Sequence, residues 1–222
     1  MYTAIIVEPR KHKALSFVLN NFCENLSNDW NFIIFHGNLN IDYISDIIKG
    51  KLSNHKHRIS MLNLNVDNLT IPDYNRLFIN NFEFYDKIPT EIFLVFQTDT
   101  MINTQYKDLI NDFLEYDYVG APWIWTTPYG QVGNGGLSLR KKSKMLEIMK
   151  NGKNKHLNED VYFSMSNVIK LNKPTFEKAK EFSMEMIFSE KSFGCHKSYA
   201  YINNSILFKT YPDIELLKEL NM

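Results

Sequence analysis

The sequence has few of the features that mark secreted or membrane proteins. Its two cysteines, Cys23 and Cys195, lie far apart and have no CxxC or Cys/His spacing, so we expect reduced thiols. No hydrophobic run approaches the length that spans a membrane, and the apolar stretch 1–7 is too short for a signal peptide. These absences predict a soluble, cytoplasmic protein without a membrane span.

The chain also lacks an excess of charge of either sign. Its 25 basic residues balance 25 acidic ones, and no basic stripe with interleaved aromatic residues is present. A balanced chain has no global field that attracts nucleic acid, so any anion site must be local. The hydrophobic content of 44% excludes intrinsic disorder, and 222 residues suit a single domain with a sizeable core.

Several catalytic signatures are missing as well. The sequence has no GxGxxG fingerprint, no P-loop ending in Gly-Lys-Ser/Thr, no GxSxG elbow and no HExxH helix. A Rossmann dehydrogenase, a P-loop nucleotidase, an α/β-hydrolase and a zinc protease of that type are therefore excluded.

The first hundred residues alternate between apolar strand patterns and helical periodicity. This alternation predicts an α/β fold with a mostly parallel sheet and helices on both faces, whose ligands bind beyond the carboxyl ends of the strands. The expected strands are 3–8, 31–37, 58–65 and 91–99, and the expected helices are 11–26, 41–52 and 72–88. The second half is less regular, with helices expected over 106–116, 141–150 and 158–169 and strands over 116–123 and 136–140.

Polar residues follow the strands where each apolar run stops. The segments are "EPR" at 8–10, "HGN" at 36–38 and "QTDT" at 97–100. Within the last segment, Asp99 ends a buried strand, where one carboxylate together with water and phosphate oxygens can hold Mg²⁺ or Mn²⁺. An aspartate at this position can equally cap a following helix. The local sequence favours neither interpretation.

The segment "QVGNGGLSLR", residues 131–140, places three of the nine glycines within four positions. Glycine is needed where the backbone bends through positive φ or something bulky comes close. The preceding loop carries Trp123, Trp125 and Tyr129, and aromatic faces beside a polar loop suit a sugar ring. Clustered aromatic residues also pack cores, so this interpretation needs support from other motifs.

Two further motifs carry titratable side chains. In "NED", residues 158–160, Glu159 has the ordinary role of an acid in a first helical turn, and Asp160 is a candidate general base facing a cleft. In "FGCHKSY", His196 is a candidate ligand, although a lone histidine is more often a surface or capping residue. The adjacent Lys197 supplies a charge suited to phosphate.

Taken in order, "VEPR", "FHGN", "VFQTDT", "YDYVGAPW", "VGNGGLSLR", "NEDVYF", "FSMEMIF" and "FGCHKSY" resemble an uncharacterised family related to GT-A glycosyltransferases. The resemblance spans nearly the whole chain. It implies a GT-A-like, Rossmann-type α/β/α sandwich with a nucleotide-binding half at 1–100 and an acceptor-side half at 101–222. It also implies a nucleotide-sugar donor, with UDP as the expected nucleotide, and a glycan or protein acceptor.

The resemblance assigns roles to individual residues. A DxD motif ends a central strand in GT-A enzymes, and Asp99 matches its last acid, with Gln97 standing where the first acid would be. The implied metal ligands for Mn²⁺ or Mg²⁺ are Asp99 and His196. The other implied groups are donor-binding Glu8, Arg10, His36, Gln97, Thr98, Asp99 and Lys197, substrate-binding Trp123, Gly133, Asn134, Gly135 and Gly136, and catalytic Glu159 and Asp160.

The resulting hypothesis is a metal-assisted, inverting glycosyltransferase in which Asp160 takes the proton of the acceptor hydroxyl. Two alternatives stay open. A non-catalytic nucleotide- or glycan-binding module is favoured by Gln97, and a nucleotide-sugar hydrolase uses the same chemistry with water as the acceptor. The transferred sugar, the acceptor, the stereochemistry and the oligomeric state are not encoded in these motifs.

Overall fold

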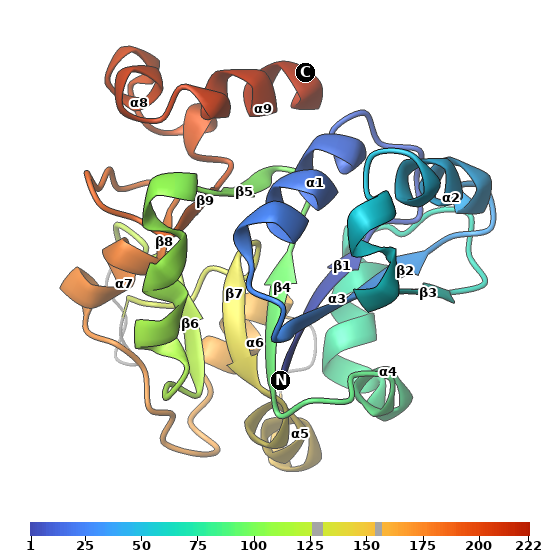
Figure 1. Cartoon of the computed structure of the whole chain (residues 1–222). Helices are drawn as coiled ribbons and strands as arrows, with labels where there is room; N and C mark the ends of the chain where they lie inside the picture. Colours follow the sequence, from blue (N-terminus) through green and yellow to red (C-terminus); the bar gives the residue numbers. More distant parts are fainter. Residues whose placement is uncertain (126–130, 154–156) are drawn as a thin grey trace.

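The computed structural model describes residues 1–125, 131–153 and 157–222, so Tyr129 and the rest of 126–130 lie outside the described residues. Its centre is a six-stranded sheet of order β3-β2-β1-β4-β7-β6 (Figure 1). The strands are β1 (Tyr2–Val7), β2 (Trp30–His36), β3 (Ile59–Asn63), β4 (Ile92–Phe96), β6 (Tyr118–Gly120) and β7 (Ser138–Lys141).

Most of the sheet is parallel. β1 pairs in parallel with β2 on one side and with β4 on the other, and β2 pairs in parallel with β3. Only β7 among these strands runs the other way, because it pairs antiparallel with both β4 and β6. The predicted mostly parallel sheet of an α/β fold is therefore confirmed. The reversed β7 begins at the edge where the parallel strands end, which brings the glycines before it to that edge.

Helices cover both faces of the sheet, and successive residues of β1 show why. Ala4 and Ile6 pack into one hydrophobic cluster with α1 and α2, whereas Ile5 and Val7 pack into a second cluster with α3 to α6. A strand buried on both faces needs apolar residues at nearly every position. The helices are α1 (Leu15–Asn25), α2 (Ile41–Lys49), α3 (Ile71–Asn80), α4 (Phe82–Asp86), α5 (Lys142–Asn151) and α6 (Glu159–Ser164).

Side-chain capping divides the helix expected over 72–88 into two. Thr70 and Asp73 form a capping box that starts α3. Asn81 then leaves the helical conformation, and its side chain accepts a hydrogen bond from the amide of Phe84, which starts α4. The apolar periodicity continues across this break, so the pattern alone did not predict it.

The second half builds a small sheet beside the large one. Its order is β5-β9-β8, and the antiparallel pairing of β5 with β9 places Thr100 opposite His196. In Figure 1, α8 and α9 lie over the end of the main sheet toward which β4 points. The remaining elements are η1 (Ser53–Arg58), β5 (Thr100–Ile102), η2 (Thr104–Phe113), α7 (Phe176–Phe182), β8 (Ser183–Met184), β9 (Gly194–His196), η3 (Ser198–Ala200), α8 (Asn204–Thr210) and α9 (Asp213–Asn221).

Both cysteines are free, as the sequence predicted, and both are buried. Burial raises the pKa of the Cys23 thiol and of the Cys195 thiol to about 12, so neither is a reactive thiolate at neutral pH. Within the part of the chain that the structure describes, no helix has both the length and the apolar character needed to cross a bilayer.

Candidate functional site

A cavity of about 370 Å³ lies at the carboxyl ends of β1, β3 and β4. In open α/β sheets this edge is where ligands bind, because the loops that follow the parallel strands meet there. The N-terminus of α6 and the residues before β7 close its other side. It is lined by Val7, Glu8, Pro9, Arg10, Asn68, Leu69, Thr70, Ile71, Tyr74, Asn75, Gln97, Thr98, Gly135, Gly136, Asn158, Glu159 and Asp160.

The turn after β1 presents a fixed ion pair to the cavity. The buried carboxylate of Glu8 accepts hydrogen bonds from Nε and Nη2 of Arg10, both at 2.8 Å. Asn40, at the start of α2, donates from Nδ2 to the carbonyls of Glu8 and Arg10. A bidentate pair keeps the guanidinium in one orientation at the rim, and this orientation suits an anionic ligand.

The end of β4 faces α3 across the cavity. Gln97 donates from Nε2 to the hydroxyl of Tyr74 at 3.0 Å, and burial raises the pKa of that hydroxyl above its ordinary value. The adjacent Thr98 is buried, and its carbonyl accepts a hydrogen bond from Asn221 of α9. The side-chain amide of Gln97, which stands where the DxD pattern has its first acid, is therefore held in place by Tyr74.

The close approach at the glycines comes from the protein itself. A Cβ on Gly135 would lie 2.8 Å from Cβ of Asp160, and one on Gly136 would overlap the ring of His196. Gly133 packs against Trp123 and Ser164 outside the cavity lining. Side chains of the fold therefore lie close beside each of these glycines, while Gly135 and Gly136 also line the cavity and Gly133 does not.

This crowding makes Gly136 a sensitive position. We expect Gly136→Ala to displace the His196 ring and to lower the free energy of unfolding by about 1–3 kcal/mol, the usual cost of overpacking. The matched control is Gly50→Ala, where the nearest atom to the new Cβ is the carbonyl oxygen of Asp46 at 3.1 Å. Urea unfolding of both variants checks the difference, and equal losses would contradict it.

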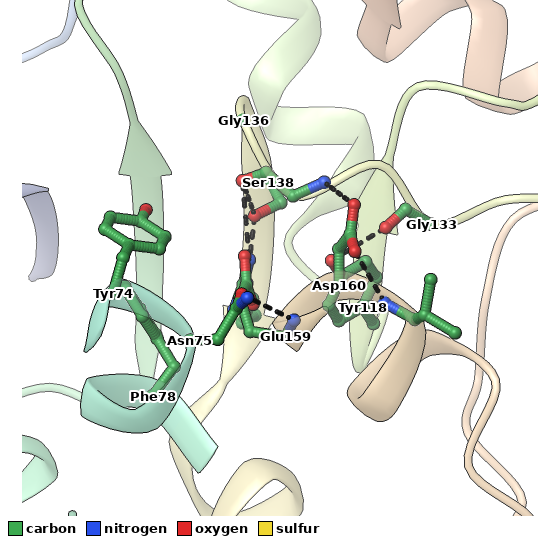
Figure 2. A network of polar contacts seen from close by, with 12 residues as sticks. Tyr74, Asn75, Phe78, Tyr118, Gly133, Gly136, Ser138, Glu159 and Asp160 are labelled. Carbon is green, nitrogen blue, oxygen red and sulfur yellow. Dashed lines mark hydrogen bonds and ion pairs between the residues drawn. The ribbon is translucent and has the colours of Figure 1, made fainter. Parts of the chain in front are cut away.

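Asp160 sits in the cavity wall with its carboxylate held by the backbone. Oδ1 accepts from the amide of Val161 at 2.7 Å, and Oδ2 accepts from the amide of Gly135 at 3.3 Å (Figure 2). Burial, followed by the neighbouring charge of Glu159, raises the pKa of Asp160 to about 6. A carboxyl group with such a pKa is basic enough to accept a proton and is ionised at neutral pH.

Glu159, the adjacent acid, makes a different set of contacts. Its carboxylate accepts from Nη1 of Arg140 at 2.5 Å and from Nη2 at 2.9 Å, so both oxygens are engaged. Arg140 is fully buried beneath the cavity, and the charge of Glu159 keeps its pKa raised despite that burial. The guanidinium also lies over the rings of Phe78, Tyr118 and Phe163, at 5.3, 5.1 and 5.9 Å from their centroids.

Asp99 and His196 meet directly beside the cavity. His196 Nε2 lies 3.5 Å from Asp99 Oδ1, and this oxygen is buried with no hydrogen-bond partner among the described residues. Burial lowers the pKa of His196, but the carboxylates of Asp99 and Glu185 outweigh that effect and raise it. Lys197 adopts a left-handed φ of 48°, and its amide donates to the carbonyl of Asp99.

These two side chains fit a divalent cation held by few protein ligands. A carboxylate and an imidazole suit Mn²⁺, and phosphate oxygens with water complete such a shell. Over residues 1–125, 131–153 and 157–222, no three or more His, Cys, Asp or Glu side chains could hold one metal ion together. The unsatisfied Asp99 oxygen is therefore the observation that favours a cation shared with a phosphate ligand.

The other residues implied by the sequence lie at varying distances from the cavity. His36 is buried and points its Nδ1 at the carbonyl of Gly37, away from the lining. Trp123 is buried and stacks on Trp125, with ring centroids 5.5 Å apart. Asn134 is buried and accepts from the amide of Gly136, which fixes the glycine loop. The Lys197 residue is exposed and lies outside the lining.

Sequence reasoning missed three residues of this region. Both Tyr74 and Asn75 belong to α3. Tyr74 reaches Gln97 at the end of β4, and Asn75 reaches the start of α6, where its Oδ1 accepts from the amide of Glu159 at 3.0 Å (Figure 2). No local pattern distinguishes them from other helical positions. Arg140 did carry a signal, because a charged residue inside an apolar strand pattern needs a buried partner.

Several solved structures with a similar fold are glycosyltransferases. GlyE of Streptococcus pneumoniae TIGR4 is 11% identical with a TM-score of 0.59. The match covers 99% of this chain and 63% of the GlyE chain. Galactosyltransferase LgtC, solved with donor and acceptor sugar analogues, is 10% identical with a TM-score of 0.56. The match covers 99% of this chain and 95% of the LgtC chain. Mannosyltransferase PcManGT of Pyrobaculum calidifontis, solved with GDP-Man and Mn²⁺, is 10% identical with a TM-score of 0.54. The match covers 78% of this chain and 54% of the PcManGT chain.

These similarities define the fold as that of GT-A-type glycosyltransferases. The profile of the family described as "Protein of unknown function (DUF5672)" matches residues 58–196, more than half of the chain. The chain therefore belongs to that family. No curated protein matches the sequence significantly.

Proposed function

We propose that the protein is a glycosyltransferase that moves a sugar from a nucleotide-sugar to a hydroxyl group of a glycan or protein. One observation carries the proposal: the carboxylate of Asp160 stands in the wall of the cavity at the carboxyl ends of β1 and β4, with a pKa raised to about 6. A group of this kind is placed and poised to act as a general base on a bound ligand.

The donor occupies the cavity in this proposal. Arg10, fixed by Glu8, faces the anionic part of the donor, and the pair of Gln97 and Tyr74 offers polar atoms to its ribose. Asp99 and His196 would hold Mn²⁺ or Mg²⁺ beside the diphosphate. The cation supplies positive charge for the departing nucleoside diphosphate when it is bound.

The chain's own residues then carry the proton transfer. The acceptor oxygen attacks the anomeric carbon as the bond to the diphosphate breaks, and Asp160 takes the hydroxyl proton. Amides of Gly135 and Val161 hold the carboxylate in place through this step. Glu159 acts as a positioning residue, because both of its oxygens are already bound to Arg140. A single displacement of this kind inverts the anomeric configuration.

Calorimetric titration tests the donor site. UDP and GDP are titrated in Mn²⁺ and in EDTA into the wild type, Asp99→Asn and the control Asp108→Asn, an exposed position in η2. We expect one nucleotide to bind more tightly with Mn²⁺, and we expect Asp99→Asn alone to lose that gain. Asp99 carries a buried oxygen without a partner, whereas the control side chain faces solvent.

The other outcomes separate the alternatives. Binding that is equal in Mn²⁺ and EDTA would remove the cation from the proposal and leave the transfer step to be tested with sugar donors. Absence of binding by both nucleotides would contradict the proposed donor and favour a non-catalytic glycan-binding module. Release of free sugar at the same rate with and without acceptor would identify a hydrolase.

A further inference from the structure

The segment "FSMEMIF", residues 182–188, has no role in the steps above, although it carries a buried acid. Glu185 directly follows β8, and only 5% of its surface is exposed. Its Oε1 lies 3.2 Å from Nδ1 of His196, at ion-pair distance. Its Oε2 is buried and, within the described ranges, has no hydrogen-bond partner. A buried carboxylate with so few partners needs an explanation.

His196 lies between two carboxylates. Its Nε2 lies 3.5 Å from Asp99 Oδ1, and its Nδ1 lies 3.2 Å from Glu185 Oε1, both at ion-pair distance. Nδ1 is buried and, among the described residues, has no partner with hydrogen-bond geometry. The two ring nitrogens of an imidazole point in diverging directions, so the two acids approach different edges of the ring. An ion bound to Nε2 and Asp99 is therefore out of reach of Glu185. The acid at 185 is not a third ligand of the same ion.

The strand pairing holds this arrangement in register. Met184 of β8 pairs with Cys195 of β9, so Glu185, which directly follows β8, and His196, the last residue of β9, lie side by side. Thr100 of β5 pairs with His196 from the other side, which sets Asp99 at the opposite edge of the ring. Backbone hydrogen bonds of a three-stranded sheet therefore position all three side chains.

A neutral imidazole carries one proton, and its location decides whether a cation can bind. A proton on Nε2 would point at Asp99 and remove the lone pair that a metal ion needs. A proton on Nδ1 leaves Nε2 free and lies on the edge of the ring nearer the Glu185 carboxylate. Metal-binding histidines commonly donate their other N–H to a carboxylate, which fixes both the ring orientation and the tautomer.

We propose that Glu185 is a positioning residue that holds the proton of His196 on Nδ1 and keeps Nε2 open for the divalent cation shared with Asp99. This inference rests on the proposed function, because it concerns the same cation. It goes further by naming an outer acid that selects the binding-competent form of the histidine. Of the two carboxylates beside the ring, removal of Glu185 leaves Asp99, which draws the proton to Nε2 and blocks the metal-binding nitrogen.

Mn²⁺ binding to the protein, without and with nucleotide, tests the inference through electron paramagnetic resonance of the free ion. We expect Glu185→Leu to weaken Mn²⁺ binding about 10- to 100-fold, the usual effect of losing an outer-shell partner. Glu185→Gln should lose less, because its carbonyl oxygen can still accept from Nδ1–H. The matched control Glu190→Gln, at an exposed position five residues further along the chain, should bind as the wild type does.

A metal-free measurement gives a second readout. Nitrogen-15 NMR of labelled histidine, at a pH where the ring is neutral, should show the Nδ1–H tautomer in the wild type and a shift toward Nε2–H in Glu185→Leu. Circular dichroism of each variant establishes that it is folded, and the isosteric Glu185→Gln serves if the leucine variant is not. Nucleotide binding in EDTA should be unchanged in all variants.

Each outcome decides the point. Wild-type Mn²⁺ affinity in Glu185→Leu, or an Nε2–H tautomer in the wild type, would overturn the inference. A wild type that binds nucleotide but no Mn²⁺ would overturn the cation role of Asp99 together with that of Glu185. The wild type could also bind Mn²⁺ more tightly than Glu185→Leu does and yet bind neither nucleotide. That result would contradict the proposed donor and leave the inference about Glu185 standing.

Discussion

Asp160→Asn is expected to lose nearly all sugar transfer while donor binding is retained. The asparagine keeps the shape of the side chain but cannot accept the proton of the acceptor hydroxyl, and a positioned general base contributes about 10²- to 10⁴-fold to a rate. We expect kcat to fall by that factor and the calorimetric affinity for nucleotide to stay within the error of the wild type. Asp108→Asn, at an exposed position of η2, serves as the control for charge removal.

The wild-type pH profile provides an independent check of the same group. Because the pKa of Asp160 is raised to about 6, kcat/KM should rise with pH through that value and level off above it. The residual activity of Asp160→Asn should lack this rise. A residual rate of the variant with the same pH profile as the wild type would transfer the base role to another group.

The raised pKa of Asp160 also has a consequence for stability. Its pKa is higher in the folded protein than the ordinary value of 3.8, so the folded state binds the proton more tightly. Tighter proton binding by Asp160 stabilises the folded state by up to about 3 kcal/mol. This stabilisation is fully present below about pH 4 and is lost as pH rises through about 6. Asp160→Asn should therefore unfold at higher urea than the wild type at pH 7, but not at pH 4. Equal shifts at both pH values would contradict this linkage.

Arg140→Met is expected to give the largest loss of stability. Arg140 is fully buried, and its removal would leave the Glu159 carboxylate in the same apolar surroundings without its charged partner. Breaking a buried ion pair on one side costs about 3–5 kcal/mol. We expect a lower urea midpoint with an unchanged m-value, measured by circular dichroism.

The double variant Arg140→Met with Glu159→Leu distinguishes the lost charge partner from lost packing. Replacing both members of a buried pair by apolar side chains is often neutral, so the double variant should be more stable than Arg140→Met alone. Lys144→Met, where the side chain pairs with Glu147 at the surface, is the control and should lose about 1 kcal/mol or less. A double variant less stable than the single one would show that packing, and not charge, dominates at Arg140.

Local pattern determined the sheet-forming half of this protein. The apolar runs that became β1, β2 and β4 are continuous because helices cover both of their faces, and this continuity is visible in the residues themselves. The polar segments at Glu8 and Gln97 follow from the same pattern, since the edge where parallel strands end is set once the alternation is known. Two of the three strand-end segments, 8–10 and 97–100, indeed contribute to the cavity.

Tertiary structure decided which of the polar residues meet. Asp99, Glu185 and His196 come together only through the pairing of β5, β8 and β9, strands of two or three residues that are too short to carry a periodic signal. Arg140 likewise contacts Glu159 only because α6 lies beside β7 in the fold. Tyr74 contacts Gln97 only because α3 lies over the end of β4. The residues of one strand or one helix are related by a fixed spacing along the chain. Contacts between distant segments have no such spacing, so the sequence by itself determined the sheet and its ligand-binding edge, and the fold decided which side chains act together there.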